Sequence, residues 1–481
     1  MSGIDKWFEL SARKSTYGRE IRGGVVTFFT MAYIVVLNPL IIGTAKDING
    51  NYIGNTQDVV HAITMVAAVT ALAAGVLSIL MGVVGRFPIA IAAGLGLNGF
   101  VAFTLAPQMT WADAMGLVVI EGIIILLLVL TGFRSAVFHA VPESLKYAIG
   151  VGIGLFITVI GLVDAGIVRA GVPLISFGVN GALRGWPMFV FVVGLLITIV
   201  LVAKKVKGAI LISLIATTIL AIIVEEVAGV GPKIGGDGNI ANEVGWGLNV
   251  PSIPESFVSM PDLGLLGQFN LLGSWTAIGV VATILAIFSL MLSDFFDTMG
   301  TAFGLANEAE LVDENGDIPH FESILVVDSI AAAAGGAASA SSNTSYIESA
   351  AGIGDGARTG IASIVTGALF LIAMFVAPLV GIVPYEAAAP ALVVVGFLMM
   401  QQITHIDFRD YSIGIPAFLI ITIMPFTYSI TNGIGAGFVA YVIIKVFTGK
   451  VKEISWLMWV IAIAFAIYFA VDPISQAVGI S

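Results

Sequence analysis

The sequence predicts an all-α polytopic membrane protein with about 14 transmembrane segments. Of its 481 residues, 58% are hydrophobic and 11% are charged, whereas a soluble domain carries about 25% charged residues. The mean hydropathy is +1.05, and apolar runs of spanning length recur along the whole chain. Only helices or closed barrels satisfy every backbone group in lipid. The alternating segments of about ten residues that a barrel needs are absent, so helices remain.

Composition also excludes several classes of function. The net charge is −11, and no basic cluster follows a nucleic-acid-binding pattern, so we expect no nucleic-acid partner. Cysteine is absent, which removes disulfides and thiolate metal sites. None of the four histidines lies in the middle of an apolar run, so we predict no metal site, haem or other cofactor. No nucleophile, base and orienting group form a recognisable set, so we predict no catalytic residue and no enzyme.

The apolar runs give the order of the predicted spans. The first run is longer than the core of a signal peptide and lacks a convincing cleavage site, so we interpret it as a span. The predicted spans cover residues 24–44, 60–84, 87–105, 114–132, 145–164, 187–203, 208–224, 276–305, 323–338, 340–354, 360–381, 388–402, 412–428 and 433–447. A further run at 455–471 either crosses the membrane or lies along the bundle.

Basic residues are distributed unevenly between the two sides of this arrangement. If the N-terminus is cytoplasmic, sixteen of the 20 Lys and Arg residues lie on the cytoplasmic side, as the positive-inside rule requires. The cytoplasmic set is Lys6, Arg13, Lys14, Arg19, Arg22, Arg86, Arg134, Lys146, Lys204, Lys205, Lys207, Arg358, Arg409, Lys445, Lys450 and Lys452. We therefore predict a multi-pass protein of the plasma (inner) membrane with a cytoplasmic N-terminus.

The chain divides into two halves with matching span lengths. A Gly- and Pro-rich stretch at 229–270 separates spans 1–7 from spans 8–14 and is predicted to lie outside the cytoplasm. Corresponding spans of the two halves begin at similar offsets. Because each half has an odd number of spans, the second half must be inverted relative to the first. This pattern is typical of inverted-repeat transporters, in which interrupted spans point to the binding site.

Span 3 is one such interrupted span. Its sequence Gly94-Leu-Gly96-Leu-Asn98-Gly99 matches a dinucleotide-binding pattern literally, but no soluble βαβ unit surrounds it. Close helix packing by small residues is one interpretation. The other is an extended segment at 89–93 followed by a half-helix from about Gly94, which would direct free N–H groups and Asn98 toward a cavity.

Span 10 is the counterpart in the second half. Residues 338–349 are mostly small or polar and lie at membrane depth. Such residues are tolerated only beside a water-filled cavity or buried in protein. We expect a half-helix that begins near Thr344, with Glu348 one turn in. A purely structural helix cap is the alternative interpretation.

Acidic residues mark span 8. Asp294 and Asp297 share a helix face with Thr298 because of their spacing. An ionised carboxylate at the bilayer centre costs about 2.5–3.5 kcal/mol, so these groups are candidate proton carriers. A solvated helix end is the alternative. Glu121 in span 4 and Asp328 in span 9 are expected to be structural hydrogen-bond hubs.

Four stretches carry a family resemblance. They are GREIRGGVVTFFTMAYIVVLNP at span 1, GLGLNGF in span 3, SDFFDTMGTAFG in span 8 and TSYIESAAGI in span 10. They resemble AzgA-like purine permeases, a branch of the nucleobase–ascorbate transporter (nucleobase:cation symporter) family of xanthine/uracil permease-like proteins. The resemblance runs from about Tyr17 to Lys452. It implies a 7+7 inverted repeat, short strands in spans 3 and 10, and proton-coupled uptake of adenine, guanine or hypoxanthine by alternating access.

The resemblance also implies a site and a domain division. In this branch the purine is held by residues that correspond to Asn98, Asp294 and Glu348. Further candidate substrate-binding positions are Gly96 and Thr344, and the candidate positions for proton coupling or its support are Asp297, Thr298 and Glu348. The predicted domains are a cytoplasmic N-terminal segment at 1–23, a core domain at 24–132 and 271–381, a gate domain at 142–228 and 385–450, the extracytoplasmic loop at 229–270 and a C-terminal hydrophobic segment at 451–481.

Other functions stay open on this fold. The predicted partners are a purine nucleobase and the lipid bilayer, and a homodimer is left open. A symporter of another small solute, such as uracil, xanthine or an anion, is the first alternative because a fold does not fix its substrate. Carboxylates at Asp294 and Glu348 suit N–H donors and would repel an anion. A channel or a receptor would have a similar composition, but the inverted halves favour alternating access.

Overall fold

A computed structural model describes residues 3–131, 141–171, 174–235, 239–254, 256–312 and 318–478. Helices dominate these residues, and nine of the described helices are long and apolar enough to cross a membrane. Shorter apolar helices lie at 280–295, 411–427 and 456–470. The predicted all-α polytopic architecture is confirmed. Arg134, which we assigned to a cytoplasmic loop, lies outside the described residues.

The elements of the first half follow the predicted spans closely. They are α1 (Gly3–Phe8), α2 (Tyr17–Met31), α3 (Ile34–Ile42), α4 (Val59–Leu80), the π-helical turn η1 (Met81–Gly85), β1 (Ile91–Ala93), α5 (Leu95–Phe100), η2 (Val101–Leu105), η3 (Ala106–Gln108), α6 (Trp111–Leu130), α8 (Glu143–Asp164), β2 (Val168–Ala170), β3 (Ile175–Phe177), α9 (Trp186–Ala203) and α10 (Ala209–Ala228). Side-chain caps start several of them. Asp58, for example, accepts hydrogen bonds from the N–H groups of Val60 and His61 and so begins α4.

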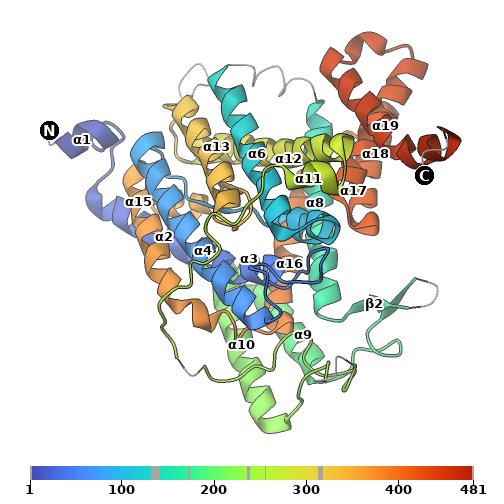
Figure 1. The fold of residues 1–481 in the computed structure, drawn as a ribbon. Coiled ribbons are helices and arrows are strands. Elements are labelled where there is room, and N and C mark those ends of the chain that lie inside the picture. The colour runs from blue at the N-terminus through green and yellow to red at the C-terminus, as the bar shows by residue number, and fades with distance from the viewer. Residues whose placement is uncertain are drawn as a thin grey trace.

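The second half repeats this order. Its elements are α11 (Gly273–Ala277), α12 (Val280–Glu308), α13 (Phe321–Ala337), β4 (Asn343–Ser345), η4 (Ile347–Ser349), α14 (Ala350–Gly354), α15 (Gly360–Ala373), η5 (Met374–Leu379), α16 (Tyr385–Met400), η6 (Gln401–His405), α17 (Tyr411–Thr427), α18 (Ile430–Phe447), η7 (Val451–Glu453) and α19 (Trp456–Val478). The last of these, which covers the run at 455–471, packs against α18 and α12, and Figure 1 shows it at the edge of the bundle.

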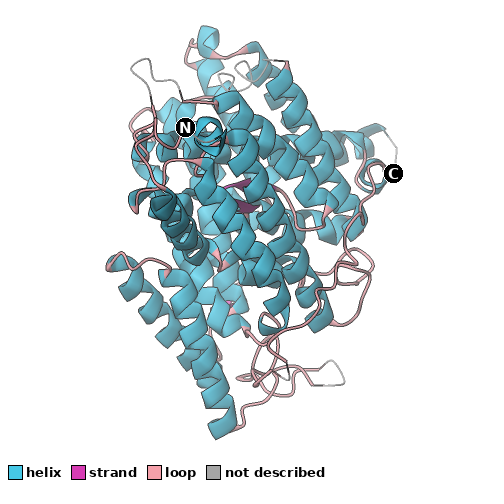
Figure 2. Cartoon of the chain, turned by 90° about the vertical axis from the view of Figure 1, so that its left-hand side faces the viewer, coloured by secondary structure: helices cyan, strands magenta, loops and turns pink. Residues whose placement is uncertain are grey.

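The two halves interlock at the centre of the molecule. Strand β1 pairs antiparallel with β4, and Ala92 lies opposite Thr344. Figure 2 shows strand at the middle of the bundle with helices around it. On either side, α4 packs on α15 and α6 packs on α13. The contacts are close: a Cβ at Gly360 would lie 2.0 Å from the carbonyl oxygen of Gly82. Glycine is therefore required for this packing between the halves.

Helix packing separates two groups of elements. We call α2–α6 and α11–α15 the core group, in which α2, α4 and α6 contact α13 or α15. We call α8–α10 and α16–α18 the gate group, in which α8 packs on α16 and α17, and α9 packs on α10 and α16. The division into core and gate domains stays a prediction, and so does movement of one group against the other.

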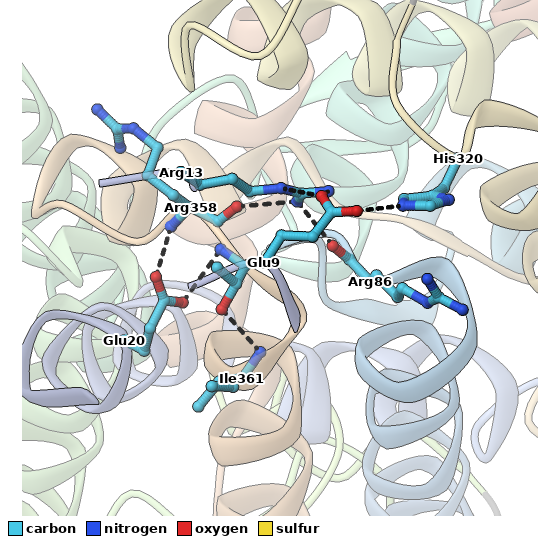
Figure 3. Close-up of polar contacts among 8 residues, drawn as sticks. Glu9, Arg13, Glu20, Arg86, His320, Arg358 and Ile361 are labelled. Carbon is cyan, nitrogen blue, oxygen red and sulfur yellow. Dashed lines mark hydrogen bonds and ion pairs between the residues drawn. The ribbon is translucent and has the colours of Figure 1, made fainter. Parts of the chain in front are cut away.

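The N-terminal segment is fastened to one end of the core group (Figure 3). The Arg13 guanidinium donates to the backbone carbonyls of Arg86 and Arg358, at 2.8 and 3.1 Å. Glu9 forms an ion pair with Arg13 at 2.8 Å, and its other carboxylate oxygen lies 3.2 Å from the Nε2 atom of His320. At the same end, Asp355 accepts hydrogen bonds from Arg22 and Lys207. Basic residues that the positive-inside argument assigned to one side thus gather at one end, whereas hairpin β2–β3 lies toward the other end in Figure 1.

Candidate functional site

Both broken spans enter the centre of the core group as a strand followed by helical turns. In span 3, Gly94 is extended and α5 begins at Leu95, as expected from the sequence. In span 10, the expected start of the half-helix near Thr344 is wrong. Thr344 lies within β4, and the first helical turn begins at Ile347 with Glu348 inside it. The reason is tertiary: the backbone of Thr344 is used in pairing with β1.

A hydrogen-bond network holds β4 in place. Asp328 on α13 accepts from the N–H and the hydroxyl of Ser345, at 3.1 and 2.8 Å. It also accepts from the Thr298 hydroxyl at 2.7 Å, and that hydroxyl lies 2.8 Å from the hydroxyl of Thr344. Asp328 therefore has the contacts of a structural hub. Thr298 and Thr344, two candidate site residues, are buried links of the same network.

Glu348 faces a break in span 1. Helix α2 ends at Met31 and α3 begins at Ile34. Tyr33, in the break, is buried, and its hydroxyl donates a hydrogen bond to the Glu348 carboxylate. Glu348 is half-buried, and Asp297 on α12 is exposed. The sequence argument did not single out Tyr33, although this residue lies inside the span 1 stretch that carries the family resemblance.

Asn98 and Asp294 lie deeper in the core group. Both side chains are fully buried, and none of their polar side-chain atoms has a hydrogen-bond partner among the described residues. Glu121, on α6, lies close enough to Asp294 for the two carboxyl groups to interact electrostatically, and its own two carboxyl oxygens also lack a hydrogen-bond partner among the described residues. The structure thus brings Asp294 against an acidic residue that we had expected to be a structural hub.

Gly96 lies at a contact between the core and gate groups. A Cβ on Gly96 would approach the Cγ2 atom of Ile153, on α8, to 2.5 Å. Further along, the Thr104 hydroxyl donates to the backbone carbonyl of Tyr428 at 3.0 Å. The half-helix of span 3 is therefore seated directly against gate-group helices.

The chemistry of this region favours a hydrogen-bond-donating, uncharged ligand. Asp294, Asp297 and Glu348 supply carboxylate acceptors, and Asn98 supplies a donor and an acceptor. No Lys or Arg occurs in spans 1, 3, 8 or 10 of the sequence. An anion would therefore meet acidic groups without a compensating cation, whereas a neutral ring with N–H groups would find partners.

Comparison with known proteins agrees with this geometry. A family model described as the permease family matches residues 18–436. The chain belongs to the permease family. This permease is 37% identical to a putative permease of Methanocaldococcus jannaschii over 98% of each chain. It is 34% identical to the guanine/hypoxanthine permease PbuG of Bacillus subtilis, over 96% of this chain and 98% of that protein.

Further similar proteins point the same way. The adenine permease AdeP of Escherichia coli is 33% identical over 96% of the present permease and 95% of its own length. The predicted resemblance to purine permeases is thereby confirmed, and these relatives are permeases, not enzymes.

Solved structures show the fold. The transmembrane domain of a cyanobacterial bicarbonate transporter, BicA, superposes with a TM-score of 0.57 at 15% identity, covering 87% of the permease and 96% of that domain. Murine Slc26a9, an anion transporter in the inward-facing state, gives a TM-score of 0.59 at 12% identity, covering 90% of the permease and 69% of that chain. The predicted 7+7 inverted repeat is confirmed, and at this identity the likeness concerns fold alone.

Proposed function

We propose that this permease takes up purine nucleobases together with protons, by alternating access across the plasma (inner) membrane, with its N-terminus in the cytoplasm. The observation that carries the proposal is the set of carboxylates without a cation around the broken spans. Purines expose ring N–H and amino donors that carboxylates accept, and ring nitrogens that an amide can donate to. The names of the relatives PbuG and AdeP support purines as the substrate class.

In this proposal the Tyr33–Glu348 pair orients the ring. The Tyr33 hydroxyl occupies one lone pair of the Glu348 carboxylate, so the remaining acceptor positions are directed at a ligand. Asp297, on α12, is exposed. It supplies a second carboxylate acceptor for the purine. Asn98 and Asp294 are buried without partners, and a purine reaching between α5 and α12 would satisfy both. Thr298 and Thr344 act by supporting β4.

Alternating access follows from where the broken spans sit. Gly96 packs on Ile153 of the gate group, so movement of the core group past α8 would carry the site from one side of the membrane to the other. The Lys207–Asp355 ion pair joins the two groups at the N-terminal end of the bundle. Opening at that end requires the pair to separate.

Uptake of labelled hypoxanthine by cells that lack their own purine transport tests the proposal. We expect competition by adenine or guanine, little competition by uracil or bicarbonate, and loss of accumulation when a protonophore is added. Glu348→Gln should lower uptake about tenfold or more, because a hydrogen bond to a charged group contributes about 1.5–3 kcal/mol.

The matched control is Glu322→Gln, a change in the first turn of α13, which should leave uptake unchanged. Competition by uracil, xanthine or bicarbonate, without competition by adenine or guanine, would assign the permease to another solute. Full accumulation with a collapsed proton gradient would contradict proton coupling.

A further inference from the structure

Glu121 of α6 and Asp294 of α12 form an acidic pair inside the core group. Both side chains are fully buried, their helices pack on each other, and none of the four carboxyl oxygens has a hydrogen-bond partner among the described residues. The two carboxyl groups lie close enough to act on each other electrostatically. Helix α6 cannot move away easily, because it packs closely on α13: a Cβ at Gly122 would lie 2.2 Å from the Ala333 backbone nitrogen. The two carboxyl groups are therefore held together by the packing of their helices.

The contact between Glu121 and Asp294 requires a proton, because neither ionised carboxylate has a hydrogen-bond donor. Two ionised carboxylates have only acceptor atoms, so they can share a hydrogen bond only when one of them is protonated. The charged groups that act on the pair from the helices packed around it are Asp328 of α13 and Asp297 of α12, which are also acidic. Asp328 already accepts from Thr298 and Ser345. No described cation compensates the pair.

A second observation is an unpartnered buried amide on a helix that packs against α12. The amide of Asn98, on α5, is fully buried, and neither its nitrogen nor its oxygen has a partner among the described residues. Helix α5 packs on α12, which carries Asp294. Buried amides are almost always hydrogen-bonded, so this part of the core group is arranged to receive a ligand beside the pair.

We propose that Glu121 and Asp294 share the proton that is coupled to transport, and that Glu121 takes this proton fully when the substrate binds. The proposal rests on the proposed function and deepens it. When a purine N–H donates to Asp294, the proton moves from the Asp294 carboxyl oxygen to a Glu121 carboxyl oxygen. No other bond changes. Without the proton, two facing carboxylates would repel each other and leave no neutral partner, so proton and purine bind together.

Asp297 and Glu348 are less suited to this role. Asp297 is exposed, whereas Glu121 and Asp294 are both fully buried. Glu348 accepts a hydrogen bond from Tyr33, so part of its acceptor capacity is already used. Glu121 is thus a positioning residue that acts through Asp294, and it separates proton coupling from purine recognition.

The test is Glu121→Gln in the purified full-length permease, reconstituted into proteoliposomes. Exchange of labelled for unlabelled hypoxanthine without a gradient needs purine binding and movement but no net proton flow. We expect this exchange to persist within about threefold, because Gln can still donate to Asp294. Accumulation driven by a pH gradient should be lost. The wild-type affinity should weaken about tenfold per pH unit where the pair is mostly deprotonated, and the variant affinity should not change.

Two further variants complete the test. Glu121→Asp keeps a carboxyl group and should restore part of the gradient-driven accumulation, even if Glu121→Gln folds poorly. Glu386→Gln removes a buried carboxylate of the gate group and should leave accumulation intact.

Gradient-driven accumulation by Glu121→Gln at the wild-type level would overturn the proposal, and so would equal loss of exchange and accumulation in both Glu121 variants. Failure of the wild-type permease to couple purines to protons would instead overturn the proposed function.

Discussion

The core and gate groups each contain a pair of neighbouring carboxyl groups, and the surroundings of the two pairs differ. In the core group, Glu121 meets Asp294 among acidic and neutral side chains. In the gate group, Asp164 at the end of α8 lies near Glu386 at the start of α16. Glu386 is also buried, but it accepts a hydrogen bond from the Gly247 N–H at 3.0 Å, and Arg169 and Lys233 are close enough to attract it.

The difference teaches where a proton is needed. A buried carboxylate can stay ionised when cations and N–H donors compensate it, and Glu386 has both. The core pair has neither, so its contact depends on a proton. The two pairs consist of the same residue types but are expected to have different roles. The gate pair, Asp164 and Glu386, holds a loop in place, and the core pair, Glu121 and Asp294, binds and releases a proton.

The largest effect is expected from Asp294→Asn. The change removes both the acceptor for the purine and one partner of the shared proton, so uptake and exchange should each fall by about 100-fold or more. Asp164→Asn, at the matched position of the gate pair, should lower uptake by about threefold or less. Uptake by reconstituted protein, normalised to folded permease, measures both. Similar losses in the two variants would remove the distinction between the pairs.

An intermediate effect is expected from Arg169→Gln, which makes the gate pair resemble the core pair. Arg169 stabilises the ionised form of Glu386, so its contribution exists where that carboxyl is ionised and fades as the pH falls. We expect a loss of stability of about 1 kcal/mol at pH 8 and less at pH 6. Thermal unfolding of the purified permease at the two pH values measures this. An equal loss at both values would show that Arg169 acts only through its hydrogen bonds to backbone carbonyls.

The smallest effect is expected from Lys207→Gln. The hydrogen bond from Lys207 is the main cause that holds the pKa of Asp355 below its ordinary value, with Arg22 adding to it. The ion pair is exposed, so it contributes about 1 kcal/mol or less. The pKa of Asp355 is lowered in the folded permease, so the stability that this pair contributes is fully present at any pH above the pKa of Asp355 in the unfolded chain. Both pH 6 and pH 8 lie above that pKa, so the effect should be the same at the two values. The measurement is the labelling rate of a cysteine introduced at the N-terminal end of the bundle. In Lys207→Gln this rate should rise by about fivefold or less, because more of the permease is open at that end. A strong pH dependence would mean that another group titrates there.

Much of the fold could be predicted from local sequence. The apolar runs predicted the helices because burial in lipid requires long apolar segments, and the small and polar residues of spans 3 and 10 predicted their interruption. The exact use of Thr344 could not be predicted in this way. Its backbone conformation is set by β1, about 250 residues away, and no local propensity encodes that pairing.

The site was partly within reach of sequence reasoning. The spacing of Asp294 and Asp297 placed them on one helix, and the family resemblance selected Asn98 and Glu348. The partners of these residues were missed because they depend on contacts between distant spans. Tyr33 reaches Glu348 only because span 1 breaks beside it, and Glu121 reaches Asp294 only because α6 packs on α12.

The pairing of β1 with β4 has a consequence for how the permease is made. The ribosome releases the first half of the chain into the membrane long before residues 343–345 exist. Until then, the Gly94 N–H lacks its acceptor, the Ser342 carbonyl, and the Ala90 carbonyl lacks its donor, the Tyr346 N–H. At membrane depth an unsatisfied backbone group costs several kcal/mol. The first half is therefore incomplete when it is first inserted. Its third span must be kept out of contact with lipid until the tenth span has been synthesised and inserted. Maturation of this permease is a late event, set by the second half of the chain.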